Sequence, residues 1–117
     1  MSKSINWYYH RKNCTSCTRA QDLIQSMKVN LPEMIIANKV KFYREDALKL
    51  IRECDVAMIT RGRKRIDVSI NTMSDEEIAS LALGRSGTLR APAFRIGKRF
   101  VIGFHAEAYQ EFLGESK

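Results

Sequence analysis

Two cysteines three residues apart, Cys14 and Cys17, lie between a run of strand-forming residues and a run with helical spacing. The run before them, residues 5–10, is aromatic and apolar, which favours a short buried strand. The run after them places apolar side chains on one helix face, at Ala20, Leu23, Ile24 and Met27. We therefore predict a strand, a polar turn and a helix that runs to about Lys28, with the cysteine pair at its start. A cysteine pair in that position is typical of thiol–disulfide chemistry.

The segment after this helix offers two candidates for the next strand. A proline at residue 32 ends the helix, and residues 33–37 form the apolar run that we predict as the second strand. Residues 40–43 are the alternative, because Val40 and Phe42 alternate with other residues. Apolar side chains at helical spacing then predict a second helix over residues 45–60, with Cys54 on its buried face.

The second half of the chain contains clear start and stop signals. Residues 61–65 predict a basic turn, and the alternation over residues 66–70 predicts a half-buried strand or extended segment. Ser74 and Glu77 have the spacing of a capping box, so a helix should follow and end at Gly84. Two strands over residues 87–96 and 99–103, a turn between them and a final helix over 106–113 complete the prediction.

The order of these elements predicts an α/β fold in a single domain over residues 1–117. A strand–helix–strand unit implies two parallel strands joined by a right-handed crossover, and the late hairpin adds an antiparallel pair. We expect a mixed four-stranded sheet flanked by helices, with a helical insert between the first unit and the hairpin. This is the arrangement of thioredoxin-like proteins.

The cysteine content and the apolar runs set further expectations. Three cysteines are too few, and odd in number, for a disulfide scaffold. A zinc site needs a second close pair of ligands, which Cys54, His10 and His105 do not form in the sequence, so we expect no metal. No apolar run approaches the roughly 18 residues that span a bilayer, and the N-terminal residues lack an apolar secretion segment. We expect a cytoplasmic monomer without membrane association or a bound cofactor.

The helix start explains why the two cysteines would differ in role. Unpaired N–H groups and the partial positive charge at a helix N-terminus stabilise a thiolate, which is the nucleophilic form of cysteine. Cys14 would occupy this end as the nucleophile, and Cys17, one turn on, would resolve the mixed disulfide. Arg11, Lys12 and Arg19 add positive charge nearby. The structural alternative is a pair of ordinary small buried side chains, which is our expectation for Cys54.

Pro92 is the second notable residue, at the start of the first hairpin strand. A proline cannot donate to a strand ladder, so it marks an edge, a bulge or a cis bond. From the residues alone, a trans proline at the start of a strand is the commoner outcome.

Two segments resemble a known family. Residues 14–20 resemble the Cys-x-x-Cys-basic-basic-Ala segment of the Spx regulators, which share a family with glutathione- or glutaredoxin-coupled arsenate reductases (ArsC-like). Residues 87–113 resemble the C-terminal half of that family, with Thr-Leu-Arg-Ala-Pro, a hairpin and Val-Ile-Gly-Phe. The resemblance implies a thioredoxin-like core with a helical insert and a cis Pro92 beside Cys14. The backbone around Pro92, including Arg90 and Ala91, would then pair with a thiol-bearing partner.

Two positions depart from the arsenate reductases of this family. Those enzymes use one nucleophilic cysteine, with an arginine four residues after it and another immediately before the proline. Thr18 and Ala91 stand at these positions, and Arg19 and Arg90 are each displaced by one residue. On a helix or strand, such a shift points a side chain elsewhere, which argues against arsenate reduction. Spx proteins also carry a basic residue at the position of Thr18.

The sequence therefore predicts a small thiol–disulfide oxidoreductase. Its partner would be a protein or glutathione disulfide, and its electron donor glutathione or a thioredoxin/glutaredoxin system. The alternative is an Spx-like redox-sensing regulator that binds RNA polymerase, in which the net charge of +7 and the basic residues 61–65 provide the contact. A solvated loop is the other interpretation of that basic run. Direct nucleic-acid binding is not expected, because no helix-turn-helix or aromatic–basic ladder is visible.

Overall fold

The computed structural model describes residues 5–32, 34–62, 64–85 and 87–114. Glu33 and Arg63, which belong to the predicted second strand and basic turn, lie outside these ranges. The helices are α1 (Thr15–Ser26), α2 (Arg44–Arg52), α3 (Asp75–Ala82) and α4 (Ala106–Leu113), with a short 3-10 helix η1 (Ile70–Thr72). The strands are β1 (Trp7–His10), β2 (Met34–Ile36), β3 (Val56–Arg61), β4 (Lys64–Ser69), β5 (Ala93–Ile96) and β6 (Arg99–Ile102).

The strands form one mixed sheet in the order β2-β1-β5-β6-β3-β4. β1 pairs with β2 in parallel, as the strand–helix–strand prediction requires, and β5 and β6 form the predicted antiparallel hairpin. The α/β class and these four strands are confirmed. The predicted strand count is wrong, because β3 and β4 add a second hairpin at the edge of β6, where β3 runs parallel to it.

β3 replaces most of the second half of the helix predicted over residues 45–60, whereas β4 corresponds to the strand or extended segment predicted over residues 66–70. α2 ends at Arg52, and Ala57, Met58 and Ile59 of β3 are all buried. A strand that is buried on both faces reads as a continuous apolar run, which helical periodicity cannot distinguish from a helix. Cys54 therefore lies after the helix and not within it, although it is only 2% exposed and belongs to the core as expected.

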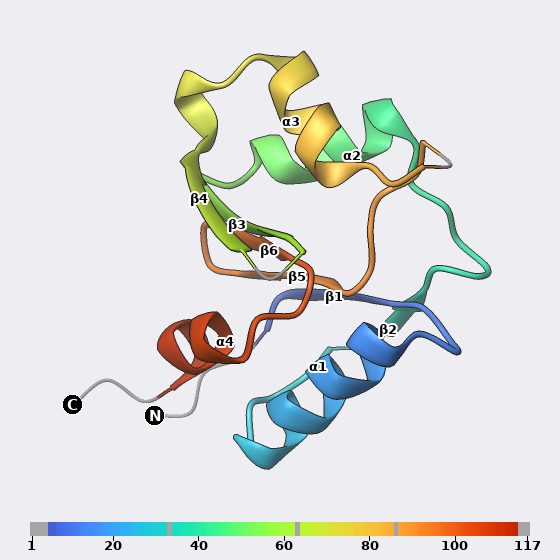
Figure 1. Cartoon of the computed structure of the whole chain (residues 1–117), viewed down its shortest axis with the longest axis vertical. Helices are drawn as coiled ribbons and strands as arrows, with labels where there is room; N and C mark the ends of the chain where they lie inside the picture. Colours follow the sequence, from blue (N-terminus) through green and yellow to red (C-terminus); the bar gives the residue numbers. More distant parts are fainter. Residues whose placement is uncertain (1–4, 33, 63, 86, 115–117) are drawn as a thin grey trace.

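Helices cover both faces of the sheet, so each face has its own apolar core. α1 and α4 lie on one side and α2 and α3 on the other (Figure 1). Successive side chains of β1 point to opposite faces and so belong to different cores. Tyr8 lies in the core with Ile24 and Tyr109, whereas Tyr9 lies in the core with Ile51 and Phe100. Within the described ranges, no helix combines the length and the apolar character needed to cross a bilayer.

Local signals account for the remaining elements. The second strand is β2 and not the alternative at residues 40–43, where Phe42 instead packs its ring 5.1 Å from that of Tyr9. Ser74 and Glu77 form the predicted capping box with hydrogen bonds of 3.1 and 2.9 Å. Gly97 adopts φ +61° in the tight turn between β5 and β6, a conformation that favours glycine.

Candidate active site

Cys14 caps the N-terminus of α1 through its sulfur. Its Sγ accepts a hydrogen bond from the backbone N–H of Cys17 at 3.3 Å, and its carbonyl accepts one from the Thr18 hydroxyl at 3.0 Å. The first turn of α1 contains no acidic side chain that would neutralise the partial positive charge of the helix end. Cys14 is partly exposed, so a sulfur at this position meets both solvent and unpaired helix N–H groups.

Cys17 is the buried member of the pair. It is 0% exposed, and all three cysteines are free thiols. Burial raises the pKa of Cys17, and the hydrogen bond with Cys14 raises it further, while a hydrogen bond from the Arg11 backbone acts in the opposite direction. Cys17 therefore stays protonated while Cys14 alone is accessible to an incoming molecule.

A buried polar group lies close to the cysteine pair. Burial, followed by the negative charges that Cys17 and Cys14 can carry, raises the pKa of Tyr8. The Tyr8 hydroxyl and His10 Nδ1 are buried and have no hydrogen-bond partner among the described residues. The sequence places both residues in a predicted buried strand and argues against His10 as a zinc ligand, but a period-two pattern does not show which polar atoms stay unpaired.

The segment before β5 lies beside the start of the cysteine loop. β1 and β5 are paired with Tyr9 opposite Ala93, so residues 90–92 run alongside the residues that follow β1. The Ala91–Pro92 peptide bond is cis, as the family resemblance implies. Arg11, Arg90 and Ala91 line a common pocket of about 380 Å³, so the structure brings together three of the predicted substrate-binding residues.

The other predicted residues lie differently. Lys12 and Arg19 are exposed, and neither lines this pocket; the backbone N–H of Lys12 binds Asn38 Oδ1 at 2.9 Å. Pro92 is buried, and its carbonyl accepts a hydrogen bond of 2.7 Å from the N–H of Gly103. Pro92 itself does not line the pocket, although Ala91, the residue before it, does.

Arg90 is half-buried and anchored by backbone carbonyls. Its Nη1 donates to Thr60 O at 2.9 Å and to Leu81 O at 3.3 Å. Burial lowers the pKa of its guanidinium, and the positive charge of Arg61 lowers it further. Two like charges therefore lie close together, and both line a second pocket next to this one.

Sequence reasoning missed Lys41 and Arg85, which line pockets next to Arg11 and Arg90. No sequence signal marks them, because single basic residues in loops are ordinary surface residues. Of the basic run that was predicted as a contact, Arg65 is engaged elsewhere, through ion pairs of 2.9 Å with both Asp67 and Glu111. Across the described ranges, no three His, Cys, Asp or Glu side chains come together in a way that would bind a metal ion.

The third cysteine provides a test of burial that does not depend on the site. Burial raises the pKa of Cys54 to about 11. The thiol ionises more easily in the unfolded chain, so its contribution to stability is complete below about pH 9 and is lost as the pH rises towards 11. We expect wild-type stability to fall between pH 8 and 10.5, with Cys54 contributing on the order of 1–2 kcal/mol of that fall. Thermal unfolding at both pH values should show a smaller fall for Cys54→Ala. Equal falls in the two proteins would contradict the prediction.

Comparison with known proteins leaves the family open. No family model matches the chain, and no curated protein is significantly similar to it. The function is therefore argued from the geometry of the cysteine pair and its surroundings.

Proposed function

We propose that this chain is a small thiol–disulfide oxidoreductase that works through Cys14 and Cys17. One observation carries the proposal: the Cys14 sulfur caps α1 and accepts the N–H of Cys17 at 3.3 Å, with Cys14 accessible and Cys17 buried. The outer sulfur thus lies at the positive end of the helix, and burial keeps the inner one as a thiol. An accessible nucleophile backed by a protected thiol is what sequential disulfide exchange needs.

The exchange proceeds in two balanced steps. The Cys14 thiolate attacks one sulfur of a substrate disulfide, forms a mixed disulfide and releases the other substrate sulfur as a thiolate. Cys17 then gives up its proton and attacks the Cys14 sulfur, which closes the Cys14–Cys17 disulfide and releases the second substrate thiol. The substrate is reduced and the protein oxidised. A dithiol donor, or two molecules of glutathione, reduces the protein again, which fits a cytoplasmic setting.

The fold supports the same proposal. Strands β2, β1, β5 and β6 lie next to one another in the sheet, with α1 and α4 on one face, which is compatible with a thioredoxin-like core of four strands. On this proposal, the β3–β4 hairpin is an addition at the β6 edge. It extends the sheet on the side away from the cysteines.

A redox-responsive regulator that binds RNA polymerase is less well supported. Its contact would use the basic residues 61–65, but the guanidinium of Arg65 is held by Asp67 and Glu111 and stacks 5.0 Å above the Phe112 ring. Arg65 is therefore engaged within the protein and is not free to contact a partner. We therefore favour enzymatic exchange.

Thiol alkylation tests the proposed function directly. With iodoacetamide at pH 7.5, we expect one thiol, Cys14, to react rapidly, because burial protects Cys17 and Cys54 and raises the pKa of each. After mild oxidation, Cys14 should become unreactive. Peptide mass mapping should then find Cys14 joined to Cys17, with a loss of two hydrogen atoms.

Cys54 is the internal control, since it is a free thiol buried in the core cluster that contains Ile51 of α2 and Ile78 of α3. It should stay unmodified in the folded protein in both redox states and react only after denaturation. A chain in which Cys14 alkylates no faster than Cys54, or in which oxidation leaves Cys14 and Cys17 unlinked, would refute the proposed function.

A further inference from the structure

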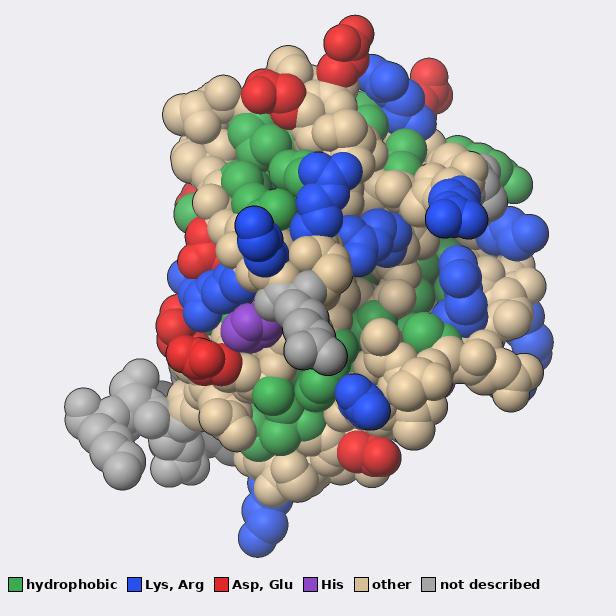
Figure 2. Space-filling model, in the orientation of Figure 1, with side chains coloured by type: hydrophobic (Ala, Val, Ile, Leu, Met, Phe, Trp, Pro, Cys, Tyr) green, Lys and Arg blue, Asp and Glu red, His purple; other side chains and the backbone are tan. Residues whose placement is uncertain are grey.

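Two sets of basic side chains have contrasting surroundings in this protein. Arg52, Arg65 and Arg95 form ion pairs with carboxylates at 2.6 to 2.9 Å. A second group lies along one hollow of the surface, whose described lining contains no carboxylate: Arg11, Lys41, Arg61, Arg85 and Arg90. We call this hollow the basic groove. Figure 2 shows Lys and Arg side chains gathered across the middle and right of one face, with Asp and Glu mainly at its upper and left margins.

The basic groove consists of three adjoining pockets. The central pocket, of about 380 Å³, shares Arg11 and Thr88 with a pocket of about 230 Å³ that reaches Lys41. It shares Arg85 and Arg90 with a larger pocket of about 640 Å³ on its other side. Shared lining residues place the three pockets side by side, so the cations that line them lie along one stretch of the surface.

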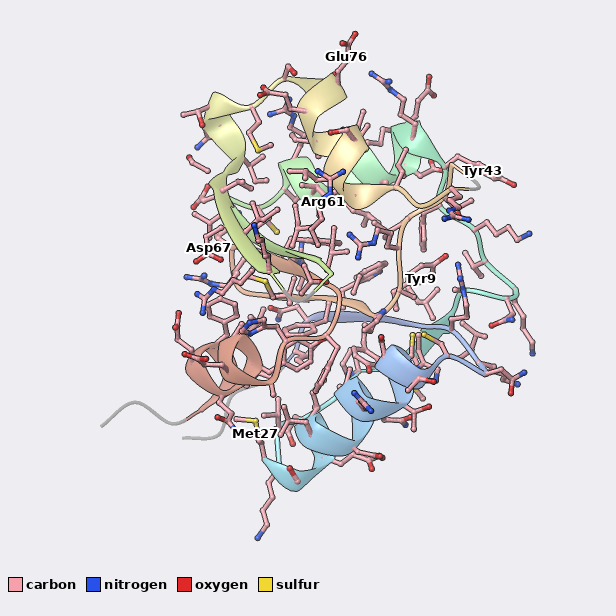
Figure 3. The ribbon with its side chains drawn as sticks, viewed as in Figure 1. Tyr9, Met27, Tyr43, Arg61, Asp67 and Glu76 are labelled. Atoms are coloured by element: carbon pink, nitrogen blue, oxygen red, sulfur yellow. The ribbon has the colours of Figure 1, made fainter. Side chains whose placement is uncertain are left out.

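The larger end of the groove lies between the end of β3 and α3. Arg61 belongs to this end, where Figure 3 places it beside α3, and Arg90 lies next to it. The charge of Arg61 helps to lower the pKa of Arg90, so the two cations are close enough to oppose each other. Positive charges that gather without a counterion favour the binding of an anionic ligand.

The groove is linked to the cysteine pair through Arg11. Arg11 lines two of the three pockets, and its backbone donates to the Cys17 sulfur. One residue therefore belongs both to the groove and to the surroundings of the thiols. Arg11 thus links the groove to the surroundings of the thiols, although neither Cys14 nor Cys17 lines the three pockets.

We propose that the basic groove binds an acidic stretch of the polypeptide whose disulfide reacts at Cys14. This inference rests on the proposed function and adds the substrate class. The cations come from separate segments along the groove, which suits a ligand with several carboxylates spaced along a chain. The ligand must also carry sulfur to Cys14, which a nucleic acid cannot do.

Matched peptide substrates test the proposal. Each carries one cysteine in a mixed disulfide with a small uncharged thiol, and the flanking residues are glutamate in one peptide and glutamine in the other. We expect the acidic peptide to form the mixed disulfide with Cys14 about tenfold faster at low salt. The difference should disappear near 1 M salt, where the screening length falls to about 3 Å.

Variants connect this preference to the groove. Arg61→Gln and Arg85→Gln should each slow the acidic peptide about threefold and leave the glutamine peptide unchanged. Arg85→Lys, which keeps the charge, should restore most of the rate. Lys49→Gln removes an exposed charge on α2, outside the three pockets, and should change neither rate.

The possible results distinguish a failure of the proposed substrate class from a failure of the proposed thiol–disulfide function. Equal rates for the two peptides would overturn the substrate class, while reaction of Cys14 with the uncharged reagent dithiodipyridine would leave the proposed function intact. Failure of Cys14 to react with either peptide or the reagent would overturn the function itself.

A single-stranded oligonucleotide that competes better than an acidic peptide of equal charge would assign the groove to nucleic acid instead. Glutathione disulfide that reacts as fast as the acidic peptide, and is unaffected by Arg61→Gln, would also overturn the proposal.

Discussion

Replacement of Cys14 by serine should lower the rate of disulfide reduction by at least about 1000-fold, because a hydroxyl does not supply the nucleophile that a thiolate does. The helix should survive the change. Serine is among the preferred N-cap residues, and its oxygen can accept the N–H of Cys17 that the sulfur accepts now. A single-turnover assay with a peptide disulfide, followed by release of the peptide thiol, measures the loss.

Cys17→Ala is the matched partner of that variant. It should still attack the substrate, but the reaction should stop at a mixed disulfide between Cys14 and the peptide, which mass spectrometry detects as a stable adduct. Circular dichroism of both variants checks that the fold is retained. The assignment of roles is wrong if Cys14→Ser forms the adduct or if Cys17→Ala completes the reaction at the wild-type rate.

Gly103→Ala should destabilise the fold by about 3 kcal/mol or more. Gly103 follows β6 with φ +91°, and a methyl group there would run into the side chain of Thr60 on β3. The glycine also ties three segments together, since its N–H donates to Pro92 O and its carbonyl accepts the buried Tyr109 hydroxyl, both at 2.7 Å. Chemical denaturation would measure the loss in the free energy of unfolding.

Gly97→Ala is the control for the backbone contribution. Gly97 also has a positive φ, of +61°, but nothing lies within 4 Å of the position that a methyl group would take. Its loss should therefore be only about 1 kcal/mol, which reflects the backbone conformation alone. If Gly103→Ala proves no less stable than Gly97→Ala, the close approach of Gly103 to Thr60 does not determine which side chain is tolerated at residue 103.

Strong local signals made parts of the fold predictable. The capping box at Ser74, the turn at Gly97 and the strand–helix boundary around Cys14 each depend on residues close together in the chain. β3 was missed for the opposite reason. Its residues gain their strand conformation from pairing with β6 and β4, and burial on both faces removes the alternation that would have marked it.

The candidate site also contains some residues that local sequence signals identify and others that they do not. Cys14 and Cys17 were found from their spacing, whereas the cis bond at Pro92 followed from a resemblance and not from any local pattern. The basic groove was not predictable, since its cations are brought together from segments as distant as Arg11 and Arg90. Among exposed basic residues, the sequence does not show which ones have found a carboxylate, as Arg65 has with Glu111.

The β3–β4 hairpin also has a consequence for self-association. It makes β4 the outer strand on its side of the sheet, where unpaired backbone groups are a template for strands of other chains. β4 is charged along its length, with Lys64, Arg65 and Asp67 among its six residues. Arg65 also reaches Glu111 on α4, so the edge is bordered by charged groups from a second element. Charges at an outer strand disfavour pairing with another chain. The hairpin therefore enlarges the sheet and also gives it an outer strand that is unfavourable for aggregation.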